Sequence, residues 1–308
     1  MSILLVAQRR DMTPVKEALL KADPNLDIEI WPNVSDPKRI TFAIAWNHPK
    51  DVFKQYPNLK MISSLGAGVD HLINDDSIPE SVTITRVVAP TLTSDMSDYV
   101  MTAVLNYLRS THIFYRQQER NEWNMILAKD KKAHTIGIMG LGELGRRTAT
   151  DLVKIGLNVT GWARTKKEID GVKTFTGDQL DQFLAATNIV VCLLPLTSKT
   201  EDILNLELFK KLKKPAHVIS VGRGKHLVEE DLIYALDADI IDSATLDVFR
   251  EEPLPESHPF WNRKKIVITP HIASVSDPDE VAELLIDNYK RMLSGIQQRH
   301  IVDKNREY

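Results

Sequence analysis

Cysteine is almost missing from this sequence: one residue, Cys192, occurs among 308, within an apolar run. A single thiol cannot form a disulfide within the chain, so the sequence favours a reducing compartment, the cytoplasm. A secretory signal is not predicted, because the first basic residues, Arg9 and Arg10, follow the N-terminal apolar run instead of preceding it. That run, residues 3–7, is also too short to span a membrane, and it is typical of a first β-strand.

An excess of charge of one sign is likewise missing. Lysine and arginine together number 39 and aspartate and glutamate 42, which gives a formal net charge of −3. This balance excludes the basic surface by which many proteins bind nucleic acids. Hydrophobic residues make up 43% and charged residues 26%, as in folded globular proteins, and the length suits two domains.

Short apolar runs alternate with amphipathic stretches of helical length, which predicts βα units and parallel sheets. In the N-terminal part we expect five strands that form a flavodoxin-like sheet. They lie at residues 3–7, 27–31, 42–46, 61–65 and 82–85. Apolar residues at helical spacing then predict one long helix over residues 94–118, which could link two domains. An acidic amphipathic helix at residues 278–293 is expected to return to the first domain.

Six further strands with helices between them predict a Rossmann-type, doubly wound parallel sheet. They lie at residues 134–139, 158–162, 189–194, 217–221, 241–246 and 266–269. The fold class is therefore α/β. Residues 1–95 and 276–308 are expected to form a discontinuous substrate (catalytic) domain, and residues 96–275 the dinucleotide-binding domain.

The segment Gly140-Leu-Gly-Glu-Leu-Gly145 has the G-x-G-x-x-G spacing and stands between a predicted strand and a predicted helix. In that context Gly140 permits the tight turn, Gly142 lets the backbone approach a pyrophosphate, and Gly145 allows close helix–strand packing. The N–H groups at the helix N-terminus attract phosphate. We expect Gly140, Gly142, Glu143, Leu144 and Gly145 to bind the cofactor, although an ordinary βα turn is the alternative.

The end of the next strand indicates which cofactor is bound. About twenty residues after the glycine motif, an NAD site usually places an acidic residue on the ribose hydroxyls, but Gly161-Trp-Ala-Arg-Thr-Lys-Lys167 contains none. Arg164, Thr165 and Lys166 instead offer positive charge and a hydroxyl, and arginine can bind a phosphate with two hydrogen bonds. We therefore predict that NADPH is preferred over NADH, the alternative being a solvated basic turn.

Three segments with chemically useful side chains each follow an apolar strand. They are Ser220-Val-Gly-Arg-Gly224, Asp247-Val-Phe-Arg-Glu-Glu-Pro-Leu-Pro255 and Thr269-Pro-His-Ile-Ala-Ser274. In open α/β sheets, ligands bind at the carboxyl ends of the strands. The three segments should therefore meet at one edge of the second sheet.

In order and spacing, these segments resemble motifs of the D-isomer specific 2-hydroxyacid dehydrogenase family. Leu65-Gly-Ala-Gly-Val-Asp70 matches the substrate loop of that family, and Asp98 and Trp123 stand where the family often has an acidic residue and a tryptophan. Within the family, the chain resembles the bacterial glyoxylate/hydroxypyruvate reductases of the A type. The segments that carry this closer likeness are Trp162-Ala-Arg-Thr-Lys166, Glu252-Pro-Leu-Pro255 and Val302-Asp-Lys-Asn-Arg-Glu-Tyr308.

The resemblance implies an oxidoreductase that reduces small 2-oxo acids, with His271 as proton donor, Glu252 orienting its ring and Arg223 holding the substrate carboxylate. Histidine suits the task because its ordinary pKa lies near neutrality. The N–H groups of Ala67 and Gly68 are expected to bind the carboxylate as well. The other implied cofactor contacts are Pro195, Leu196, Thr197, Val221, Gly222, Asp247 at the nicotinamide carboxamide, and His271.

Two alternatives stay open. A dehydrogenase with broad specificity for larger 2-oxo acids would share these motifs, because one sequence does not reveal the walls of the pocket. A dinucleotide-sensing binding protein without activity could share the fold, although the complete set of Arg223, Glu252 and His271 favours an enzyme. A homodimer is expected, since the long helix should bury an exposed apolar face against a second copy, and no metal is expected.

Overall fold

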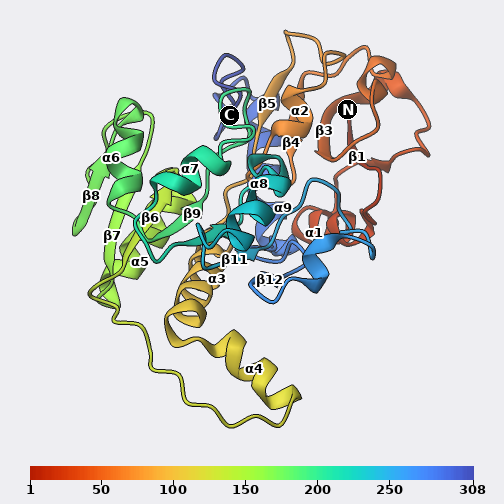
Figure 1. Ribbon diagram of the computed structural model, residues 1–308. Coiled ribbons are helices and arrows are strands. Elements are labelled where there is room, and N and C mark those ends of the chain that lie inside the picture. Colours follow the sequence, from red (N-terminus) through yellow and green to blue (C-terminus); the bar gives the residue numbers. More distant parts are fainter. The chain divides into compact units, whose positions relative to one another are not determined.

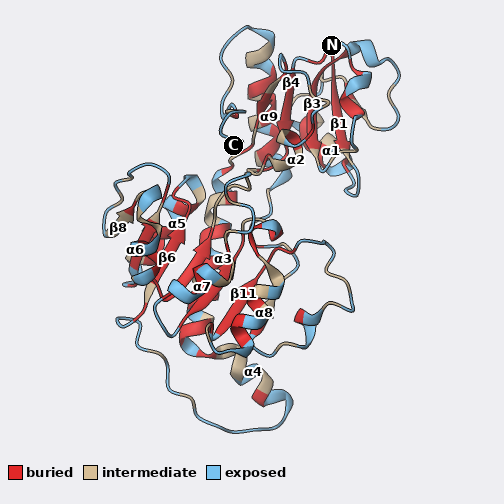
Figure 2. Cartoon of the chain, turned by 45° about the horizontal axis from the view of Figure 1, so that its top comes forward, coloured by how far each residue is buried: buried red, intermediate tan, exposed pale blue.

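The computed structural model describes residues 1–308. The chain forms two compact units, residues 1–92 with 276–308 and residues 93–275 (Figure 1). In both units the central strands are buried, whereas many loop residues are exposed (Figure 2). None of the helices combines the length and the apolar character that a transmembrane span requires.

The first unit is built on a five-stranded parallel sheet with the order β2-β1-β3-β4-β5. Its strands are β1 (Ser2–Ala7), β2 (Ile28–Ile30), β3 (Ile40–Trp46), β4 (Met61–Ser64) and β5 (Thr83–Thr85). Its helices are α1 (Thr13–Ala22), α2 (Asp70–Ile73), α9 (Pro278–Leu293) and the short 3₁₀ turns η1 (Pro37–Arg39) and η2 (Val52–Gln55). The central strands are apolar on both faces, as in other covered parallel sheets, and the five predicted strands are all present.

Helix α9, from the end of the chain, packs against the N-terminal part of the same unit. The Asp277 carboxylate caps it by accepting N–H groups of its first turn. Tyr289 places its ring 5.5 Å from that of Phe42 in β3, and Lys290 pairs with Asp23, after α1, at 2.9 Å. The C-terminal helix thus belongs to the unit that contains the N-terminal sheet.

The second unit contains a seven-stranded parallel sheet with the order β12-β11-β10-β9-β6-β7-β8. Its strands are β6 (Thr135–Met139), β7 (Asn158–Trp162), β8 (Val172–Phe175), β9 (Ile189–Cys192), β10 (His217–Ser220), β11 (Ser243–Leu246) and β12 (Ile266–Ile268). The Rossmann-type fold is confirmed, but the prediction of six strands was wrong. Edge strand β8 was missed because only Phe175 of its four residues is buried, so it has no apolar pattern.

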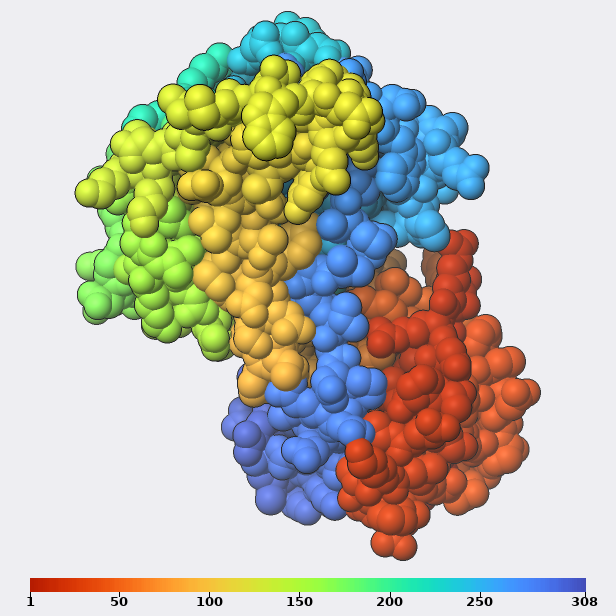
Figure 3. All heavy atoms as spheres, turned by 90° about the horizontal axis from the view of Figure 1, so that it is seen from below, coloured from red at the N-terminus to blue at the C-terminus, as the bar shows by residue number.

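The long helix predicted over residues 94–118 is divided into two. Ser110 adopts a left-handed conformation with φ of 56° and separates α3 (Pro90–Arg109) from α4 (Thr111–Glu119). The other helices of this unit are α5 (Glu143–Lys154), α6 (Leu180–Ala185), α7 (Leu206–Lys211), α8 (Glu229–Asp237), η3 (Gly177–Gln179), η4 (Gly224–His226) and η5 (Pro259–Asn262). After α4, residues 122–130 have no regular structure and lie on the surface of the unit (yellow in Figure 3).

Candidate active site

The glycine turn between β6 and α5 has the geometry of a phosphate cradle. Gly140 has φ of 100°, a conformation that residues with a side chain rarely adopt. A Cβ atom at Gly145 would lie 1.8 Å from the carbonyl oxygen of Gly140, whereas a Cβ atom at Gly142 would meet nothing within 4 Å. Gly145 thus allows helix and turn to touch, and Gly142 leaves open space in front of the N-terminus of α5. This arrangement fits a dinucleotide pyrophosphate, with Glu143 and Leu144 in the first turn of the helix.

The turn after β7 presents basic side chains to solvent. Arg164, Thr165 and Lys166 are exposed, and the Thr174 hydroxyl of β8 fixes the turn by donating to the carbonyl of Lys167 at 2.8 Å. The missed strand β8 therefore supports the segment on which the predicted NADPH preference depends. No acidic side chain precedes Glu168 in this turn.

His271 and Glu252 form a hydrogen-bonded pair beyond the ends of β11 and β12. The His271 Nδ1 atom lies 2.7 Å from Glu252 Oε2, and both side chains are about one-third exposed. Burial raises the pKa of Glu252, but hydrogen bonds from His271 and the Phe249 N–H and the nearby positive charges outweigh it and lower the pKa. The carboxylate is therefore ionised at neutral pH and can only accept, so Nδ1 carries the proton of this bond.

The backbone that carries His271 is held by Asp247. This carboxylate is 1% exposed and accepts the Thr269 hydroxyl at 2.6 Å and the N–H groups of Ile272 and Ala273, each at 2.9 Å. The carbonyl of Asp247 accepts the N–H of His271, whose φ is 53°. Asp247 thus fixes an unusual backbone conformation at the candidate proton donor. Its expected contact with a nicotinamide carboxamide stays a prediction.

Arg223 lies after β10, on a loop that packs against the segment of Glu252. Its guanidinium donates to the carbonyl of Gly222 at 2.8 Å. A Cβ atom at Gly224 would lie 1.9 Å from the carbonyl carbon of Phe249, so only glycine lets the two segments approach this closely. Together with the contacts of Asp247 and Glu252, this packing brings the three predicted segments to one edge of the sheet.

The neighbouring strand ends complete this edge. Val221 is buried directly after β10, and Gly222 is partly exposed. After β9, Pro195, Leu196 and Thr197 form a partly buried turn. The Thr200 hydroxyl stabilises that turn by donating to the carbonyl of Pro195 at 2.6 Å and accepting the N–H of Thr197 at 2.9 Å.

Ala67 and Gly68 lie in the first unit, in the loop after β4. The loop is anchored through its carbonyl groups: Arg86 donates to that of Ala67 at 3.4 Å, and the Ser64 hydroxyl to that of Gly68 at 2.7 Å. The N–H groups of Ala67 and Gly68 donate no hydrogen bond within the chain. Unpaired N–H groups of this kind suit a carboxylate ligand.

Three residues around these segments were not identified from the sequence. Tyr99 of α3 reaches the Thr269 hydroxyl at 2.5 Å. Burial raises the pKa of Tyr99 to about 12, with the charge of Asp247 adding to this effect and the bond to Thr269 opposing it. His226 and Arg86 were missed as well. Each of the three has a partner outside its own local segment: Thr269 for Tyr99, Pro195 for His226 and Ala67 for Arg86. No local pattern in the sequence indicates these contacts.

Comparisons with known proteins agree with this geometry. The profile of the D-isomer specific 2-hydroxyacid dehydrogenase family, NAD binding domain, matches residues 101–273. Glyoxylate/hydroxypyruvate reductase A of Photorhabdus laumondii is 38% identical over 91% of this chain and 91% of its own length. The protein of that name from Yersinia enterocolitica is 36% identical over 92% and 93%.

Solved structures give the same result. A D-isomer specific 2-hydroxyacid dehydrogenase from Xanthobacter autotrophicus, in complex with NADPH and MES, is 35% identical, with a TM-score of 0.94 over 100% of this chain and 99% of that one. The NADPH-dependent glyoxylate/hydroxypyruvate reductase of Sinorhizobium meliloti, with NADP and sulfate, is also 35% identical, with a TM-score of 0.93 over all of both chains. The present chain belongs to the D-isomer specific 2-hydroxyacid dehydrogenase family, and residues 93–275 contain its dinucleotide-binding domain.

Proposed function

We propose that this dehydrogenase reduces small 2-oxo acids, such as glyoxylate and hydroxypyruvate, to 2-hydroxy acids with NADPH. The observation that carries the proposal is the 2.7 Å bond between His271 and Glu252, near Arg223. The bond lies at the carboxyl ends of the strands of the same sheet in which β6 leads into the glycine turn. Reduction of a 2-oxo acid needs a proton donor and a group that binds a carboxylate, and these side chains supply both. The names of the relatives from Photorhabdus laumondii and Yersinia enterocolitica support the choice of substrate.

His271 is the proposed proton donor. When bound, the nicotinamide of NADPH supplies the hydride that reduces the carbonyl carbon. The Nε2–H of the His271 imidazolium donates its proton to the carbonyl oxygen, while Nδ1–H stays bonded to Glu252. The ionised Glu252 favours the charged ring before the proton is transferred. The φ of 53° at His271, fixed through Asp247, sets the direction of the ring.

Two groups are proposed to hold the substrate carboxylate. The Arg223 guanidinium is planar and can bind a carboxylate with two parallel hydrogen bonds. The N–H groups of Ala67 and Gly68 can donate hydrogen bonds to a carboxylate. Neither group contacts the side chain of the substrate, so a broad-specificity enzyme for larger 2-oxo acids is the second candidate.

We infer the preference for NADPH from Arg164, Thr165 and Lys166. The three side chains are exposed, and a positively charged turn without a carboxylate suits the 2′-phosphate that distinguishes NADPH from NADH. The complexes of the Xanthobacter autotrophicus and Sinorhizobium meliloti relatives with NADPH and NADP support this inference.

A panel of 2-oxo acids with each cofactor tests the proposal. We expect glyoxylate and hydroxypyruvate to give higher kcat/KM than phenylpyruvate, and NADPH higher than NADH, measured by loss of nicotinamide absorbance. A preference for phenylpyruvate would favour the second candidate. No turnover with any 2-oxo acid, together with intact NADPH binding, would favour a dinucleotide-sensing protein.

We further propose that the enzyme is a cytoplasmic homodimer formed through α4 and residues 122–130. Trp123, Met125 and Leu127 are 100%, 88% and 80% exposed, on a segment at the surface of its unit (Figure 3). Apolar side chains in such a row are typical of an interface. Sedimentation should give twice the mass of the chain, and a combined Trp123→Ser, Met125→Ser and Leu127→Ser variant should sediment as a monomer. A monomeric wild type contradicts this assignment.

A further inference from the structure

His226 is a buried histidine that connects two loops of the candidate site. It ends the short turn η4 and has no exposed surface. Its Nδ1 accepts the backbone N–H of Arg223 at 3.1 Å, and its Nε2 lies 3.3 Å from the carbonyl oxygen of Pro195. A Cβ atom at Gly222 would lie 3.0 Å from the ring, so the loop lies directly on the imidazole. One side chain therefore contacts both the loop after β9 and the loop after β10.

The hydrogen bonds define the tautomer of this ring. Burial lowers the pKa of His226, but the interactions with Cys192 and the bond to Pro195 outweigh it, so the pKa is raised overall. The N–H of Arg223 points at Nδ1, which must be unprotonated to accept it. The proton of a neutral ring is then on Nε2, where it is donated to the carbonyl of Pro195. The neutral tautomer with its proton on Nε2 satisfies both bonds, because Nδ1 accepts from Arg223 while Nε2–H donates to Pro195.

We propose that His226 is a positioning residue of the dehydrogenase: through Nδ1 it fixes the backbone from which Arg223 reaches the substrate, and through Nε2–H it fixes the Pro195–Thr197 turn against the cofactor. The inference rests on the proposed function, because it assigns Arg223 to the substrate and the turn to the cofactor. The ring of His226 bonds to both loops, at Arg223 in one and at Pro195 in the other.

Two conservative variants separate the two bonds. In His226→Asn the amide oxygen occupies the place of Nδ1, so the bond from Arg223 is kept and the bond to Pro195 is lost. In His226→Gln the amide nitrogen extends to the place of Nε2, so the bond to Pro195 is kept and the acceptor for Arg223 is lost. A buried polar group that loses its partner weakens the interactions that depend on it, here by about tenfold.

The expected results are opposite for the two variants. His226→Asn should raise the Kd of NADPH about tenfold and change kcat/KM for glyoxylate at saturating NADPH by less than about threefold. His226→Gln should lower that kcat/KM about tenfold and leave the Kd of NADPH within about threefold. Equal losses in both measurements for both variants, or no change in either, would mean that His226 only fills space.

His217 supplies the matched control, because it is also buried in this unit and bonded through both ring nitrogens. It stands at the start of β10, at the opposite end of the strand from Arg223. His217→Asn and His217→Gln should lower the Tm without changing the Kd of NADPH or kcat/KM for glyoxylate. If the control pair changes these constants as the His226 pair does, the loss is one of general stability and the positioning role is wrong.

Two further measurements keep this inference separate from the proposed function. NADPH fluorescence gives the Kd without turnover, and titration of the NADPH complex with oxamate, an unreactive carboxylate, reports on Arg223. If the wild type reduces no 2-oxo acid, the proposed function fails, and these two titrations still decide on His226. In the wild type, ¹⁵N spectra of the histidine rings should contain a neutral Nε2–H ring signal that disappears in His226→Asn. A protonated ring or an Nδ1–H tautomer at pH 7 overturns the proposal.

Discussion

Two histidines of the second unit lie at opposite ends of the strands of one sheet, and they differ in burial and in hydrogen-bond partners. His217 begins β10 and is only 2% exposed. Its ring bonds to the hydroxyls of Ser243 at 2.8 Å and Thr245 at 3.2 Å. His271 follows β12, is about one-third exposed and bonds to the carboxylate of Glu252. The residue type is the same, and the partners differ in charge.

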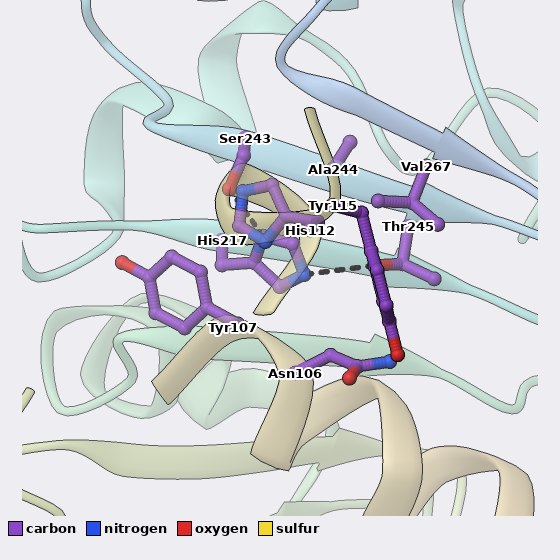
Figure 4. A pocket seen from close by; sticks show the side chains of 9 residues that line it. All are labelled: Asn106, Tyr107, His112, Tyr115, His217, Ser243, Ala244, Thr245 and Val267. Atoms are coloured by element: carbon purple, nitrogen blue, oxygen red, sulfur yellow. Dashed lines mark hydrogen bonds between the residues drawn. The ribbon is translucent and has the colours of Figure 1, made fainter. Parts of the chain in front are cut away.

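The surroundings of His217 keep its ring neutral. The ring of Tyr107 stacks on it at 4.3 Å and 16°, and a cavity of about 90 Å³ lies beside it, lined also by His112 and Tyr115 (Figure 4). Burial lowers the pKa of His217 to about 3, with the charges of His112 and Lys129 adding to this effect and a bond to Ser243 opposing it. Hydroxyl groups can accept a hydrogen bond from the ring but carry no negative charge. The protonated ring therefore gains no interaction that offsets the cost of its burial.

At His271 the partner is an ionised carboxylate, and about one-third of the side chain is exposed to solvent. The two rings therefore differ in burial and in the charge of the partner, and the proposed role of His271 as proton donor depends on both. The following predictions test that difference, in order of their effect on turnover.

The largest effect is expected from His271→Ala. Loss of the proton donor should lower kcat for glyoxylate reduction by about a hundredfold or more, while the Kd of NADPH stays nearly unchanged. His217→Gln is the control and should keep wild-type kcat. Unchanged kcat in His271→Ala would assign the proton transfer to another group.

A smaller effect is expected from Glu252→Gln, which keeps the shape of the partner and removes its charge. The neutral amide no longer favours the protonated ring, so the pH above which kcat/KM falls should move down by about one unit or more. In the wild type, the lowered pKa of Glu252 keeps its carboxylate ionised at pH 4.5 and above, and its contribution is lost only as the pH falls further, through that lowered value. A pH profile of kcat/KM that starts below pH 4.5 and extends to pH 9 measures both limbs. Identical alkaline limbs for variant and wild type would exclude this role.

The sequence predicts the frame of this comparison well. All eleven predicted strands, and the helix after the glycine turn, are present. They need only local apolar patterns and one turn of fixed geometry at Gly140. The meeting of Arg223, Glu252 and His271 follows from a general rule, because the carboxyl ends of parallel strands share one edge. The family resemblance, which is confirmed, adds the expected roles.

Other features could not be predicted because their causes lie outside the local pattern. The left-handed conformation of Ser110, which divides α3 from α4, has no glycine or asparagine to indicate it. Strand β8 is an exposed edge without alternation. His226 looked like one of nine histidines, and its link between Pro195 and Arg223 appears only after two loops have folded together.

A still smaller effect is expected from Asp247→Asn. One amide oxygen cannot replace a carboxylate that accepts three hydrogen bonds, and the amide nitrogen would face an N–H group. The backbone of His271 should loosen, with a loss in kcat of about tenfold. A rise in the Kd of NADPH at unchanged kcat would instead support a contact of Asp247 with the nicotinamide carboxamide. Steady-state kinetics and NADPH fluorescence distinguish these two results.

The smallest effect on turnover, and a clear one on stability, is expected from His217→Gln. Because the folded chain holds His217 neutral down to a pKa of about 3, the unfolded chain binds a proton at this residue as the pH falls below about 6.5, and the folded chain does not. The contribution of His217 to the free energy of unfolding is therefore present above pH 6.5 and falls by about 2 kcal/mol between pH 7 and pH 5. Glutamine does not titrate, so the variant should lose about 2 kcal/mol less than the wild type over this interval in urea unfolding. If both proteins lose the same amount, His217 is protonated in the folded chain, and the contrast with His271 no longer rests on charge.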